Sequence, residues 1–87
     1  ARMKNLPTFR QFRVQPVDRP DGPPDKLAIV DPQVDIRKTI PARMDKTPVI
    51  QAMEYLASIG ITIHAVAPAI RQQEWRLLSR DFETPLR

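Results

Sequence analysis

Basic and aromatic residues near the N-terminus have the side chains that proteins use to hold nucleic acid. The first seventeen residues carry four basic side chains and no acidic one, and the remainder balances, so this segment accounts for the whole net charge of +4. A charge excess at one end is typical of a segment that binds a polyanion. We predict that Lys4, Arg10 and Arg13 contact phosphates, and that Phe9 and Phe12 pack or stack there. A tail that only improves solubility would have the same composition.

A second group of polar residues lies near the C-terminus, in a helix expected at 68–80 whose polar side carries Gln72, Gln73, Arg76, Ser79 and Arg80. The members of the group are Arg71, Gln72, Arg76 and Arg80. Arginine pairs with guanine and glutamine with adenine in the grooves of a duplex, so these residues are the second predicted contact set. A polar face of this kind is also typical of a surface that meets only water. Glu74 falls inside the apolar arc of the same helix, so either Arg71 neutralises it or that arc meets a partner.

The residue types needed for catalysis and for metal binding are nearly absent. The chain has two glycines, far apart, which excludes a phosphate-binding loop and a dinucleotide-binding motif. It has no cysteine and one histidine, which excludes a thiolate or imidazole metal cluster. His64 has apolar neighbours and is predicted to be structural. We therefore expect a protein that is not an enzyme and binds no metal or cofactor.

Length and composition limit the architecture. A chain of 87 residues has room for one domain, and a hydrophobic content of 41% argues against disorder. No apolar run approaches the roughly 18 residues that a membrane helix needs. The N-terminal residues lack the apolar core of a secretory signal. We expect a cytoplasmic protein with no membrane partner; the sequence leaves open whether Ala1 and Arg2, which precede Met3, are native.

Prolines divide the chain into two parts. The segment QPVDRPDGPPD at 15–25 contains four prolines, which rule out a regular helix or an interior strand. We predict a basic, proline-rich arm and linker over 1–25 and a small α+β domain over 26–87. Within the arm, TFRQFRV alternates loosely between apolar and basic residues. It is either an edge strand or a segment that becomes ordered on binding.

Two short segments after the linker have the character of strands. KLAIVD at 26–31 is a compact apolar run. QVDIRKTI at 33–40 alternates with a period of two, broken only by Lys38, and prolines bound it on both sides. One face of this second segment would carry Val34, Ile36, Lys38 and Ile40, and the other Asp35, Arg37 and Thr39.

The clearest pattern in the chain predicts a helix over 48–59. Thr47 is a good N-cap, Pro48 suits the first helical position, and Gly60 suits the position after the helix. Between them the apolar residues fall on one half of a helical wheel. This face is predicted to pack on the core.

The stretch that follows Gly60 has two interpretations. The segment EYLASIGITIHAVAPAIRQQEW resembles the helix-turn-helix of small excisionase-like regulators, through Tyr55, Leu56, Gly60, Ile61, Thr62 and Val66, with Ile70 continuing the apolar stripe. The resemblance implies a helix-turn-helix over 48–72 whose second helix enters the major groove of DNA.

Pro68 favours a different structure. In the helix-turn-helix it would be the sixth residue of the recognition helix, where proline costs about 3 kcal/mol. The β-branched residues of ITIHAVA instead predict a strand over 61–67, and Pro68 then begins the helix at 68–80.

The sequence therefore predicts an α+β domain with two or three short strands and two helices. Two functions fit it. The first is a small nucleic-acid-binding protein, an accessory or regulatory factor of a phage or mobile element, that uses the arm and the Arg/Gln face. The second is a protein-interaction or assembly subunit that docks through its proline-rich arm, a strand edge or an apolar helix face, or self-associates.

Overall fold

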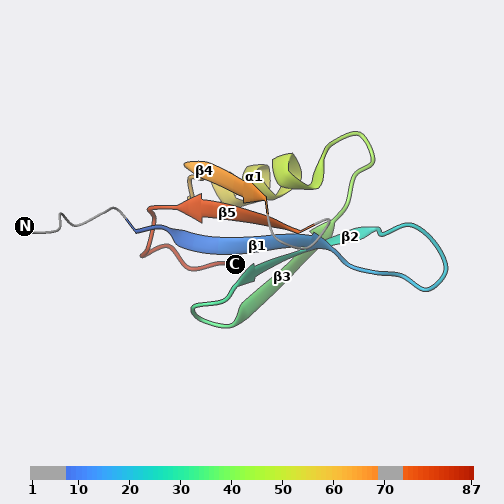
Figure 1. The fold of residues 1–87 in the computed structure, drawn as a ribbon, viewed down its shortest axis with the longest axis horizontal. Coiled ribbons are helices and arrows are strands. Elements are labelled where there is room, and N and C mark those ends of the chain that lie inside the picture. The colour runs from blue at the N-terminus through green and yellow to red at the C-terminus, as the bar shows by residue number, and fades with distance from the viewer. Residues whose placement is uncertain (1–7, 69–73) are drawn as a thin grey trace, which may run out of the picture.

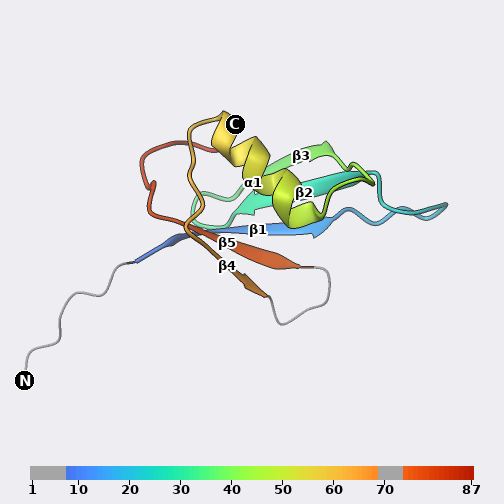
Figure 2. The same cartoon turned by 90° about the horizontal axis from the view of Figure 1, so that it is seen from above.

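The main feature of the computed structural model, which describes residues 8–68 and 74–87, is a five-stranded sheet. The elements in chain order are β1 (Arg10–Pro16), β2 (Lys26–Asp31), β3 (Ile36–Pro41), α1 (Pro48–Ser58), β4 (Ala65–Pro68) and β5 (Trp75–Ser79). The strand order is β3-β2-β1-β5-β4, and every pair is antiparallel. Helix α1 lies across one face of the sheet (Figures 1 and 2). It packs on β1, β2 and β5.

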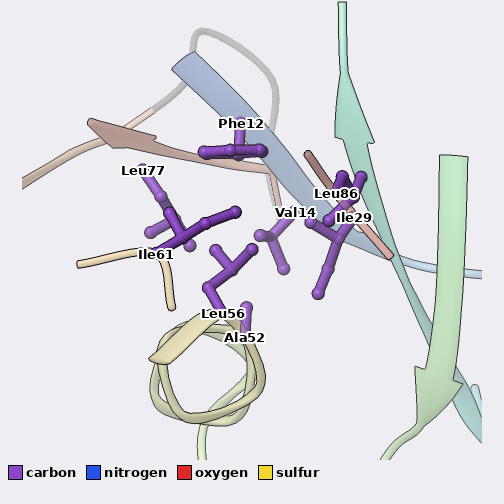
Figure 3. Close-up of a cluster of buried hydrophobic side chains, with 8 residues drawn as sticks. All are labelled: Phe12, Val14, Ile29, Ala52, Leu56, Ile61, Leu77 and Leu86. Carbon is purple, nitrogen blue, oxygen red and sulfur yellow. The ribbon is translucent and has the colours of Figure 1, made fainter. Parts of the chain in front are cut away.

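The hydrophobic core fills the space between α1 and the sheet. Phe12 and Val14 of β1, Leu77 of β5 and Leu56 of α1 have no exposed surface. These side chains meet in one cluster (Figure 3), which also includes Ile29, Ala52, Ile61 and Leu86. Burial of this face is what holds a helix as short as α1, because isolated helices of this length are marginal in water.

The prediction of two or three strands and two helices is wrong: the structure is mostly a sheet, with one short helix among the described residues. One cause is the segment 10–16, which was placed in an arm and instead forms β1, in the middle of the sheet. Its alternation gives it one apolar side that packs on the core and one polar side. Its two arginines, of which Arg10 is buried on the core side and Arg13 is exposed on the polar side, suggested a solvated tail.

The helix expected at 68–80 is also wrong. Trp75–Ser79 is strand β5, between β1 and β4, and Pro68 is the last residue of β4. Proline is tolerated there because β4 is an edge strand. The helix-turn-helix over 48–72 is excluded as well, because α1 is followed by a turn at 59–60, by four residues without regular secondary structure and then by β4. Pairing with β1 and β4 outweighs the helical spacing of the apolar residues in this segment.

Other local predictions agree with the structure. Strand β2 has the predicted bounds, and β3 begins later than predicted, because residues 32–35 form the turn before it. Helix α1 begins after Thr47, whose hydroxyl accepts a hydrogen bond from the Ile50 N–H at 3.4 Å. Gly60 has φ +91°, a conformation that glycine adopts without strain. No helix within the described ranges has the length and apolar character needed to cross a membrane.

Candidate nucleic-acid interface

The two faces of the sheet differ in composition. On β1, Phe12 and Val14 point toward α1, whereas Gln11, Arg13 and Gln15 point to the opposite face and are exposed. We call this opposite face the open face. Across the described parts of the chain, no helix or strand packs on it, because α1 lies on the other side (Figure 2). The exposed side chains of β1 on this face can therefore meet a ligand.

Three arginines form a row across the open face. Arg13 lies directly opposite Arg76 on one side and opposite Val30 on the other. Val30 in turn lies opposite Arg37. Residues in register share a face, and neighbouring strands lie about 4.8 Å apart. The backbones of Arg13 and Arg76 are therefore adjacent, with that of Arg37 about 10 Å away on the other side. We call Arg37, Arg13 and Arg76 the arginine row.

Small and uncharged polar residues flank the arginine row. Gln11 pairs with Leu78 of β5. Gln15 pairs with Ala28, and Ala28 pairs with Thr39 of β3. Gln11, Gln15 and Thr39 are exposed and can donate hydrogen bonds to oxygen atoms without adding negative charge.

The arginine row is electrostatically unfavourable by itself. Like charges directly opposite each other on neighbouring strands destabilise a sheet. The nearest compensation is Glu74, whose Oε1 lies 3.8 Å from Nε of Arg13. The Glu74 side chain is largely buried and that of Arg13 is half-exposed, so this one carboxylate offsets part of the charge of the row. Nε of Arg76 is buried and has no hydrogen-bond partner in the described structure. An anion bound over the row would relieve the repulsion between Arg13 and Arg76.

Phe9 and Arg80 extend the open face beyond one end of β1 and β5. The ladder pairs Arg10 with Ser79, so its continuation places Phe9 opposite Arg80, on the side of Gln11. The Arg80 guanidinium lies 5.1 Å from the centre of the Phe9 ring. Phe9 is half-buried and Arg80 is exposed. The pair adds a fourth arginine and an aromatic ring to this side of the molecule.

Arg10 and Phe12 lie on the opposite side of β1 and do not belong to this surface. Arg10 is 4% exposed, and its Nε and Nη2 donate to Oδ2 of Asp31 at 3.0 and 2.6 Å. Its Nη1 donates to the carbonyl oxygens of Asp81 and Thr84. Arg10 thus holds the C-terminal segment against the sheet, while Phe12 is in the core. Neither side chain can reach a phosphate from there.

The structure brings together only part of the predicted site. Arg13, Arg76, Arg80 and Phe9 share the open face. Lys4, Arg71 and Gln72 lie outside the described residues. Sequence reasoning missed Arg37, Gln11, Gln15 and Thr39. Gln11 and Gln15 face the same way as Arg13 by alternation along β1, whereas only the register of the strands shows that Arg37 and Thr39 do so.

Comparison of the chain with protein-family models, with curated protein sequences and with solved structures finds no significant match.

Proposed function

We propose that this protein binds nucleic acid through the open face of its sheet. The observation that carries the proposal is the arginine row, in which Arg13 and Arg76 are directly opposed and, among the described residues, only one carboxylate, that of Glu74 at 3.8 Å from Nε of Arg13, is paired with the three arginines. A protein gains nothing for its own stability from such a pair. Phosphate groups supply the missing counter-charge, and arginine binds them through two parallel hydrogen bonds.

The geometry favours contact with the phosphate backbone over recognition of base sequence. Within the described residues, the arginine row and its flanking residues include no aromatic ring on which a base could stack. The one ring on this side, Phe9, lies beyond the end of the strands, with Arg80 over it. Phosphate contacts set affinity and salt dependence but carry little sequence information. We therefore infer binding that depends weakly on sequence.

The proposal is tested by measuring affinity for a random-sequence DNA duplex over a series of salt concentrations. If the three arginines of the row each neutralise one phosphate, log K falls with log salt with a slope of about −2.7 from these contacts. Replacing all three with glutamine should remove that part of the slope and keep the fold. Fluorescence anisotropy with a labelled duplex measures the affinity and its salt slope. The same measurement with a single strand of matched sequence shows whether the duplex or the single strand binds more tightly.

A matched control separates a local site from net charge. Arg19, Arg43 and Arg87 are exposed and lie in loops or at the C-terminus, away from the row. Their triple glutamine variant loses the same three charges. Equal losses of affinity in both triple variants would mean that net charge alone drives binding. Absence of binding by the unaltered protein at low salt would eliminate the proposed function.

A further inference from the structure

Strand β3 is an unpaired edge of the sheet. It is the first strand in the order β3-β2-β1-β5-β4, and the described chain places no strand beyond it. It is six residues long and almost entirely exposed, whereas the opposite edge, β4, has four residues. The unpaired edge of β3 presents backbone groups that can pair with another strand.

The register shows which backbone groups of β3 are free. The Ala42 N–H donates to the Asp25 carbonyl at 2.9 Å, just beyond the end of the β2–β3 ladder. Hydrogen-bonded pairs recur every second residue in an antiparallel ladder, so Ile40, Lys38 and Ile36 also bond to β2. The N–H and C=O groups of Arg37 and Thr39 therefore point away from the sheet. Pro41 has no N–H, so the free edge ends there.

A hollow lies beside this edge because α1 does not cover β3. The helix packs on β1, β2 and β5 only. Between α1 and β3 is a hollow of about 620 Å³, lined on the strand side by Lys38 and Ile40 and on the helix side by Glu54 and Tyr55. The register places Ile36 on the same side of β3, and this residue is 39% exposed. An added strand would have apolar surface to bury on this side.

The charged residues of β3 indicate the chemistry of a strand that could pair with its free edge. Among the described residues, neither Arg37 nor Lys38 has a carboxylate within ion-pair distance. Glu54, the acidic group in the hollow, is held by Lys46 at 2.9 Å. The geometry points to β3 as the docking edge for an extended segment of a partner protein in which apolar and acidic residues alternate. The apolar residues would enter the hollow, and the acidic ones would lie across from Arg37 on the open face.

A second copy of this chain fits the edge less well. Two β3 strands related by a two-fold axis would oppose Arg37 to Arg37 or Lys38 to Lys38 in two of the central registers. A register centred on Thr39 pairs Arg37 with Pro41, which lacks the N–H that the pairing needs. The edge is therefore complementary to a strand of opposite charge and not to itself.

The test uses the full chain and two capped octapeptides, (Val-Glu)₄ and (Val-Lys)₄, with amide hydrogen exchange followed by NMR. In the free protein, Arg37 and Thr39 should exchange fast, and Lys38 and Ile40 slowly. Saturating (Val-Glu)₄ should slow exchange at Arg37 and Thr39 by about tenfold or more, as expected for new backbone hydrogen bonds. (Val-Lys)₄ should leave exchange unchanged.

Two variants separate strand addition from simple charge attraction. Thr39→Pro removes a free N–H but no bond to β2, and should weaken (Val-Glu)₄ binding about tenfold, whereas Thr39→Ala, which keeps the N–H, should bind within about twofold of the original. If Thr39→Pro does not fold, the slowed amide exchange at Arg37 and Thr39 makes the same decision, and Arg37→Glu tests the charge contribution, because it should reverse the preference toward (Val-Lys)₄.

Three results would overturn the inference. The first is binding of (Val-Glu)₄ without protection of the Arg37 and Thr39 amides, which would place the peptide elsewhere. The second is protection of those amides in the peptide-free protein that rises with protein concentration, because a second copy would then occupy the edge. The third is an unchanged peptide preference in Arg37→Glu.

Discussion

Arg10 and Arg13 are three positions apart on the same strand, and their side chains lie in opposite environments. Arg10 faces α1, is almost fully buried, and has Asp31 and two carbonyl oxygens as partners. Arg13 faces the open side, has a half-exposed side chain, and lies opposite another arginine with Glu74 at 3.8 Å. A buried charge must be fully paired to be tolerated, whereas an exposed one need not be. The strand therefore separates a structural arginine from one that is free for a ligand.

Replacing Phe12 and Phe9, which lie on opposite sides of this segment, should give the largest difference in unfolding free energy between the two faces of the sheet. Phe12 has no exposed surface and lies in the core, so Phe12→Ala should cost about 3–5 kcal/mol of unfolding free energy. Phe9 is half-buried under Arg80, and Phe9→Ala should cost only about 1 kcal/mol. Urea denaturation measures the unfolding free energy of both variants. Similar losses in the two variants would show that the two sides of β1 are not as different as the structure indicates.

The next largest difference in stability should come from replacing Arg10 and Arg13, the two arginines of β1. Arg10→Met leaves the Asp31 carboxylate buried without its partner and should destabilise the protein by about 3 kcal/mol, while Arg13→Met should stay within about 0.5 kcal/mol. The double variant Arg10→Met with Asp31→Leu should recover most of the loss, because no buried charge remains. A double variant less stable than Arg10→Met would show that Asp31 stabilises the turn, through the Gln33 N–H that donates to its Oδ1 at 3.1 Å, by more than its unpaired charge costs.

Single substitutions in the arginine row should affect binding and leave the fold intact. Arg37→Gln should reduce the salt slope for duplex DNA by about 0.9, the contribution of one phosphate. Arg43→Gln, which removes a charge outside the open face, should leave the slope unchanged. Thermal unfolding of both should match the original protein. Equal slopes in Arg37→Gln and the original would remove Arg37 from the interface.

The smallest effect concerns the control residue Arg43. Its guanidinium donates to both carboxylate oxygens of Asp45, at 3.0 and 2.6 Å, and this holds the pKa of Asp45 below its ordinary value. Because the pKa is lowered in the folded state, the interaction is present at neutral pH and is lost as the pH falls through the folded-state pKa. Arg43→Gln should raise the pKa of Asp45 toward its ordinary value. An NMR titration of the Asp45 carboxyl carbon shows whether Arg43 is engaged with this neighbour.

Local sequence patterns were sufficient to predict some of the helices and strands and not others. The N-cap, the proline at the first turn and the apolar stripe identified α1, because a helix is closed by bonds within a few residues. Residues 75–79 have apolar positions compatible with either a helix or a strand, and only pairing with β1 and β4 decides between them. The strand β1 was not recognised for a different reason, because its two arginines were counted as part of a basic arm, although one of them, Arg10, is buried on the core side.

The sequence by itself determined the alternation of residues along each strand, the bounds of the helix and the excess of basic side chains. Only the tertiary structure decided that Arg13, Arg37 and Arg76, which are far apart in the chain, stand in one row, and that Arg10 does not join them. Strand order and register depend on contacts between distant segments, and a shift of one residue would move each side chain to the other face of the sheet. Which arginines meet a ligand is therefore set by pairing and not by composition.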